Sequence, residues 1–135
     1  MFLMTIYVFG NQDLSEDALP FLVSKKFKNL PGIIFRTIKP NEDLPLPNDK
    51  KLYILDTVVG LDKVTLLTEK EIDRLILSRS TTAHDYDLGF QLKYLRKIGK
   101  LEKFTIIGLP MNTDLDYDLI NSIFKKLVAQ DMQGS

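Results

Sequence analysis

Two aspartates and the single histidine are the residues of this chain most suited to chemistry. Asp17 follows the loop after the first apolar segment, Asp56 closes a later apolar segment, and His84 precedes an apolar, helix-like segment. The chain has one histidine and no cysteine, so an imidazole ligand or base must be His84. Two carboxylates and one imidazole suit zinc, nickel, manganese or iron. Three protein ligands with open coordination positions are typical of a reactive or exchanging metal site.

Each of these residues also has a purely structural interpretation. Asp17 could be the N-cap of the helix that follows it, because a side-chain oxygen there accepts hydrogen bonds from free backbone N–H groups. Asp56 could cap the loop after its strand, and His84 could be a capping or surface histidine. Their spacing alone does not choose between the two interpretations.

Several other chemistries lack their sequence motifs. No Gly-x-Ser-x-Gly elbow or His-Glu-x-x-His pair is present, which argues against an α/β-hydrolase and a zinc protease of those types. There is no Gly-rich phosphate loop. A Ser-His-Asp triad of Ser15 or Ser80 with His84 stays open, although no local signature supports it.

Composition narrows the class of protein further. A length of 135 residues predicts a single domain over 1–135, and 44% hydrophobic with 27% charged residues is an ordinary globular balance. The 18 basic and 18 acidic residues cancel without a basic run, so we expect no nucleic-acid partner. The lack of cysteine agrees with a cytoplasmic location. No apolar stretch approaches the roughly 20 residues needed to span a bilayer, so we expect no membrane association.

Apolar strands alternate with amphipathic helices along the chain. We expect strands at 2–9, 33–38, 52–56, 64–67 and 103–109, and helices at 17–28, 68–77, 85–98 and 117–129. The strand at 64–67 follows its predecessor too closely for a helical crossover, which favours antiparallel pairing. Thr68 and Glu71 have the spacing of a capping box. In the helix at 85–98, both the leucine stripe and the stripe of Tyr86, Phe90 and Tyr94 are expected to pack.

This alternation predicts an α/β fold, a three-layer α-β-α sandwich around a twisted, mostly parallel sheet of about five strands with one antiparallel strand. The first strand should be central, with the second on one side and the third on the other. Ligands of such sheets bind beyond the carboxyl ends of the strands, where the strand order reverses. Asp17, Asp56 and His84 should therefore meet above the first and third strands, with further substrate contacts from the loops at Gln12, 57–61 and 111–114.

These three positions resemble the metal-binding motifs of the hydrogenase maturation endopeptidases. The first motif is the Phe-Gly-Asn at 9–11 followed by the Ser-Glu-Asp at 15–17, in which the second acid, Asp17, matches the ligand of the family. The second ligand of the family is an aspartate at the end of an apolar strand, here Asp56. The third is a histidine after a Ser/Thr-rich stretch, here His84 after Thr-Thr-Ala. The similarity spans nearly the whole chain in order and spacing.

The resemblance implies a specific activity. Members of this family remove a C-terminal peptide from the large-subunit precursor of a nickel-iron hydrogenase once nickel is in place. Asp17, Asp56 and His84 would recognise nickel supplied by that precursor, with other divalent metals able to substitute, and one of the carboxylates would act as general base. The partner would be the precursor protein, with no nucleic acid and no membrane.

Two departures from the family pattern support an alternative. Pro20 stands where family members usually carry glycine, and residues 38–41 replace a Gly-Gly-Thr-like turn beside the substrate cleft. These favour a non-catalytic protein of the same fold that binds the precursor as a chaperone. A third interpretation is an α/β binding module for a small anionic or nucleotide ligand, in which the three residues only cap.

Overall fold

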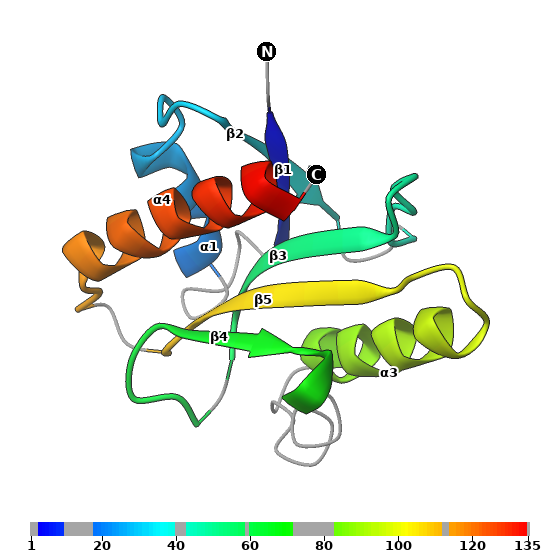
Figure 1. Ribbon diagram of the computed structural model, residues 1–135. Coiled ribbons are helices and arrows are strands. Elements are labelled where there is room, and N and C mark those ends of the chain that lie inside the picture. Colours follow the sequence, from blue (N-terminus) through cyan, green and yellow to red (C-terminus); the bar gives the residue numbers. More distant parts are fainter. Residues whose placement is uncertain are drawn as a thin grey trace.

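A five-stranded sheet, formed by the strands that the structure describes, is the centre of the fold (Figure 1). The structure, a computed structural model, describes residues 3–9, 18–39, 43–58, 60–71, 83–111 and 114–134, without the side chains of 83–87 and 133–134. The strands are β1 (Met4–Phe9), β2 (Ile33–Ile38), β3 (Lys51–Thr57), β4 (Thr65–Thr68) and β5 (Lys103–Leu109).

The strand order is β2-β1-β3-β5-β4. The first four of these neighbours run parallel, and β4 pairs antiparallel with β5. This confirms the mostly parallel sheet, the first strand between the second and the third, and the single antiparallel strand, although the middle strand of the five is β3 and not β1. The connection from β3 to β4 is too short for the helical crossover that parallel strands need, so β4 runs in the opposite direction.

The helices that the structure describes are α1 (Leu19–Lys26), α3 (Ala83–Lys97), α4 (Tyr117–Gly134) and the short 3₁₀ helix η2 (Glu69–Glu71). Helix α1 begins at Leu19 rather than near residue 17, with Pro20 in its first turn, where proline is tolerated. Helix α4 continues past the predicted end at residue 129. Of the helix expected at 68–77, the described part holds only η2, and residues 72–77 lie outside the described residues.

The capping box at the start of η2 is present. The backbone N–H of Thr68 donates to Glu71 Oε2 at 2.7 Å, and the N–H of Lys70 donates to Thr68 Oγ1 at 3.3 Å. Both side chains thus satisfy backbone donors that have no partner within the helix. The local sequence pattern predicted this contact correctly.

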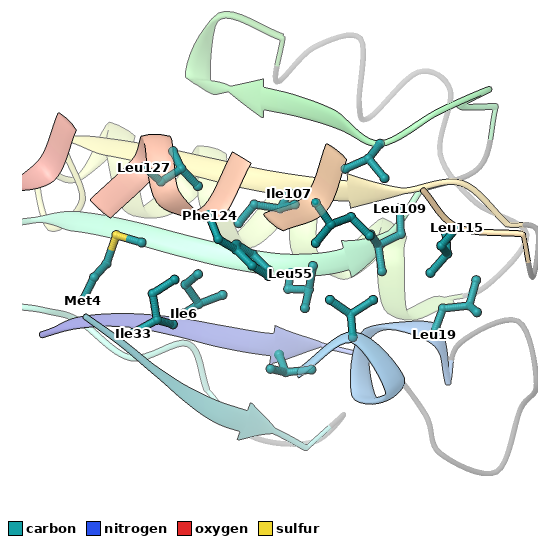
Figure 2. Close-up of a cluster of buried hydrophobic side chains, with 14 residues drawn as sticks. Met4, Ile6, Leu19, Ile33, Leu55, Ile107, Leu109, Leu115, Phe124 and Leu127 are labelled. Atoms are coloured by element: carbon teal, nitrogen blue, oxygen red, sulfur yellow. The ribbon is translucent and has the colours of Figure 1, made fainter. Parts of the chain in front are cut away.

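Two hydrophobic clusters lie on opposite faces of the sheet, which confirms the three layers. Helices α1 and α4 cover one face and α3 covers the other (Figure 1). In β3, Leu55 belongs to the first cluster while Leu52 and Ile54 belong to the second, as strand alternation requires. Figure 2 shows Leu19 of α1 and Phe124 of α4 on the same face of the sheet as Leu55.

The prediction that both stripes of the third helix pack is wrong for one of them. Leu88 and Leu92 are buried against the sheet, but Phe90 and Tyr94 are 43% and 61% exposed. A helix lying on one face of a sheet buries only one stripe, and here the aliphatic stripe occupies it. The side chain of Tyr86 lies outside the described residues. None of the described helices is long and apolar enough to cross a membrane.

One hydrogen bond joins the middle of the sheet to the end of the last helix. The Tyr53 hydroxyl in β3 donates to Asp131 Oδ1 in α4 at 2.9 Å. Burial raises the pKa of Tyr53 above its ordinary value of 10.0, and the hydrogen bond and the charge of Asp131 raise it further. The folded protein therefore holds the phenol proton more tightly than the unfolded chain does.

Tyr53→Phe is expected to lower the free energy of unfolding at pH 7 by about 0.5–1.5 kcal/mol, the usual net value of such a bond. Because the folded pKa is raised, this stabilisation is complete below pH about 10 and is lost as the pH rises above it. The difference between wild type and variant should thus narrow in alkaline solution. Urea unfolding at several pH values from neutral to alkaline measures this difference in the free energy of unfolding. Tyr94→Phe, at an exposed ring, is the control, and a constant difference between wild type and Tyr53→Phe would contradict the linkage.

Candidate active site

The strand order reverses between β1 and β3, as the sequence predicted. From β1 the chain passes first to β2 on one side and later to β3 on the other. Crossovers that leave in opposite directions open a crevice at the carboxyl ends of the two strands, which is where ligands bind in sheets of this type. The residues at the ends of β1 and β3 are therefore the first candidates for a site.

Asp56 lies at this edge and is buried. Its side chain is 1% exposed, and it is the only carboxylate among the described residues that is buried. Asp56 Oδ1 accepts a hydrogen bond from the backbone N–H of Thr57 at 2.8 Å. Removing a carboxylate from water is costly unless charge or hydrogen bonds compensate. A buried carboxylate at the point where the strand order reverses is therefore a candidate site residue. Its bond to the Thr57 N–H is also the local contact that the capping interpretation predicts.

Thr57, the last residue of β3, is the second buried polar residue at this edge. It is 1% exposed, and its Oγ1 has no hydrogen-bond partner among the residues that the structure describes. Buried hydroxyls are normally paired, so an unpaired one calls for a ligand, a water or an ion as its partner. The sequence placed Thr57 in a substrate-contacting loop, but no sequence signal marked its hydroxyl as unpaired.

His84 is the second residue of α3. The prediction that it starts a helix is confirmed, and its side chain lies outside the described residues. Strand alternation puts Asp56 on the same face of the sheet as Ile54, which is the face that α3 covers (Figure 1).

Asp17 lies outside the described residues, but the helix that follows it is described. The N-cap of α1 is Ala18, which makes no side-chain capping bond. The structural interpretation of Asp17 as the N-cap of this helix, like its interpretation as a metal ligand, stays a prediction. Among the described part of the chain, no three His, Cys, Asp or Glu side chains form a group that could hold a metal. The trio of Asp17, Asp56 and His84 includes two side chains outside that part and stays a prediction.

Gly108 of β5 is the neighbour of Asp56 in the sheet. A Cβ at this position would lie 2.8 Å from Leu61 Cδ1, 3.2 Å from the Thr65 carbonyl oxygen and 3.3 Å from Val58 Cγ2. The segment after β3 thus crosses β5 at a point where only a hydrogen leaves room. No motif in the sequence singled out this glycine, because the requirement comes from a contact between distant segments.

Gly108→Ala is expected to destabilise the protein by about 1–3 kcal/mol, since the added methyl overpacks against a backbone oxygen that cannot move alone. It should also displace the segment after Asp56. Denaturant unfolding gives the first effect, and amide chemical shifts of Val58 and Leu61 give the second. Lys103→Ala, at an exposed position of the same strand, serves as the control. Unchanged stability in Gly108→Ala would show that the segment after β3 can move away from β5 at little cost.

Comparison with solved structures finds the same fold in two proteins. Hydrogenase maturating endopeptidase HybD from Escherichia coli superposes with a TM-score of 0.59 and 17% identity, over 97% of this chain and 91% of that one. An endopeptidase from Escherichia coli, solved in solution, superposes with a TM-score of 0.54 and 22% identity, over 79% of this chain and 74% of that one. No family model and no curated protein matches. The fold that the sequence resemblance implied is thereby confirmed.

Proposed function

We propose that this protein is an endopeptidase that removes a C-terminal peptide from the nickel-loaded large-subunit precursor of a nickel-iron hydrogenase. The observation that carries the proposal is the buried carboxylate of Asp56 at the switch point of the sheet. The proposal is further supported by a fold shared with a hydrogenase maturating endopeptidase over 97% of the chain. The motif order of Asp17, Asp56 and His84 is the third support.

In this proposal, Asp17, Asp56 and His84 bind the nickel that the precursor carries, so that the metal is part of the substrate. Nickel so held polarises the scissile carbonyl. Two carboxylates and an imidazole are donors that this borderline metal accepts. The low exposure of Asp56 strengthens its attraction for a cation, because few waters screen it.

The peptide bond is broken by water. One carboxylate of the trio accepts a proton as the water oxygen bonds to the carbonyl carbon. The C–N bond then breaks, and the proton passes to the leaving amine. The products are a new carboxyl terminus on the large subunit and the free C-terminal peptide. We further propose that the Thr57 hydroxyl donates to, or accepts from, the bound peptide backbone, because its buried Oγ1 has no partner among the described residues.

Nickel calorimetry and a cleavage assay with nickel-loaded precursor test the proposal together. His84→Ala and Asp17→Asn should each abolish cleavage, and they should weaken any nickel binding by the free protein. Glu102→Gln, an exposed carboxylate just before β5 and at the opposite edge of the sheet, should do neither. If the wild type neither binds nickel nor binds or cuts the precursor, the peptidase proposal is wrong.

A precursor-binding chaperone is the second candidate. Pro20 is buried in the first turn of α1, where the family carries glycine, and proline has no backbone N–H to offer at this position, three residues after Asp17 in the sequence. Binding of the loaded precursor without cleavage, with binding lost in His84→Ala, would favour this candidate. Pro20→Gly should then restore cleavage if the missing N–H is the cause.

A further inference from the structure

A small polar pocket lies at the amino-terminal edge of the sheet, opposite the edge that holds Asp56. Helix α4 runs against the strand direction, so its last turns lie over the starts of β3 and β5 (Figure 1). The starts of these two strands form the floor of the pocket, the end of α4 forms one wall, and the junction of β4 with η2 forms the other. The pocket encloses about 230 Å³, which is below the roughly 300–1,000 Å³ of sites for drug-sized ligands. Its occupant must therefore be a small molecule.

Two lysines stand side by side in the floor of this pocket. Lys51 of β3 and Lys103 of β5 are neighbours in the sheet, and both lie on the face that α4 covers, because Leu52 and Phe104 pack on the other face. Neighbouring strands are only about 4.8 Å apart, and like charges so placed repel each other. No ion pair joins either lysine to a carboxylate among the residues that the structure describes. An anionic group between the two ammonium groups would remove this repulsion.

Two carboxylates line the walls of the same pocket. Asp131 of α4 lies on one side and Glu69 of η2 on the other. Asp131 Oδ1 accepts the hydroxyl of Tyr53 at 2.9 Å, and this bond holds the carboxylate at the pocket. A carboxylate has lone pairs for about four hydrogen bonds, so Asp131 can accept a further donor. The pocket thus presents both signs of charge to one small molecule.

We propose that this pocket binds a free amino acid with an apolar side chain. The carboxylate of the ligand lies between Lys51 and Lys103, and its ammonium group donates to Asp131. Leu127, which is buried in the wall that α4 forms, contacts the apolar side chain. Ligands with one sign of charge are disfavoured, because Asp131 and Glu69 repel a phosphate and the two lysines repel an amine. This inference does not depend on the peptidase proposal, because the pocket shares no residue with the predicted trio and lies at the other edge of the sheet.

A titration of the ¹⁵N-labelled protein with L-leucine tests the inference. Two analogues are matched to this probe: isocaproate is leucine without its amino group, and isoamylamine is leucine without its carboxylate. Inorganic phosphate is the third comparison. The expected result is saturable shifts at the amides of Tyr53, Thr105 and Asp131 with leucine, and much weaker binding of the other three compounds. The leucine shifts should also weaken as salt screens the charges.

Variants then assign the two charged halves of the pocket. Lys51→Met with Lys103→Met should weaken leucine binding roughly tenfold or more, and so should Asp131→Asn, because each change removes a hydrogen bond between charged groups. Asparagine keeps an oxygen for the Tyr53 hydroxyl, so the contact between α4 and β3 persists. Lys103→Met alone, at an exposed position, tests the same half of the pocket if the double variant does not fold.

The matched controls are changes of the same kind at exposed positions of α4 outside the pocket. Lys125→Met with Lys126→Met, and separately Asp118→Asn, should bind leucine as the wild type does. Absence of leucine-dependent shifts at the pocket, or unchanged affinity in the folded pocket variants, would overturn the proposal. Equal binding of isocaproate, isoamylamine or phosphate would overturn it as well, because one kind of charge would then be enough.

Discussion

Asp56→Asn is expected to lower the rate of precursor cleavage by roughly 10²–10⁴-fold, the range for loss of a positioned acid or base. Asparagine keeps the shape of the side chain and an oxygen that can accept the Thr57 N–H bond, but it carries no charge for nickel and cannot take a proton. The fold should persist, because the substitution removes a buried charge and adds no volume. Single-turnover cleavage of the nickel-loaded precursor, beside thermal unfolding of the free protein, measures both effects.

The matched control is Asp62→Asn, an exposed carboxylate a few residues further along the same segment. It should cleave at the wild-type rate. Full activity of Asp56→Asn would remove Asp56 from the chemistry and leave it as a loop cap. Loss of activity together with loss of folding would instead point to a structural role. Asp56→Glu then distinguishes the structural role from the chemical one, since it keeps the charge but moves it.

Phe124→Ala is expected to lower the free energy of unfolding by about 3–5 kcal/mol, a large part of the stability of a domain of this size. Phe124 is fully buried in the cluster between α4 and the sheet (Figure 2). Its ring meets Phe27 edge-on at 5.3 Å between centroids and Phe35 at 5.6 Å. The substitution removes these contacts and leaves a cavity where α4, the end of α1 and β2 meet.

Urea unfolding followed by circular dichroism measures this loss. Phe124→Leu keeps most of the apolar volume and should cost much less than the alanine variant. Met132→Ala, at an exposed position of the same helix, should leave stability nearly unchanged. A small effect of Phe124→Ala would show that the surrounding aromatic rings close the cavity.

Local patterns in the sequence were enough to predict the five strands and the places of the second and third strands on either side of the first. The runs that became β2 and β5 were placed with their observed bounds. For β5 the reason is that a strand buried on both faces is a continuous apolar run between polar turns. The order around β1 followed from short, right-handed connections between parallel strands. The same reasoning located Asp56 at the edge where the strand order reverses, and the Thr68–Glu71 spacing predicted a bond between neighbours in the chain.

Only the tertiary structure decided which groups at that edge are buried and what the helices leave exposed. The unpaired Thr57 hydroxyl and the lack of room at Gly108 depend on segments far apart in sequence, as does the bond from Tyr53 to Asp131. Sequence periodicity showed two apolar stripes on α3 and predicted that both would pack. Packing buried the aliphatic stripe and left Phe90 and Tyr94 exposed to solvent. A helix that lies on a sheet contacts it with only one of its faces.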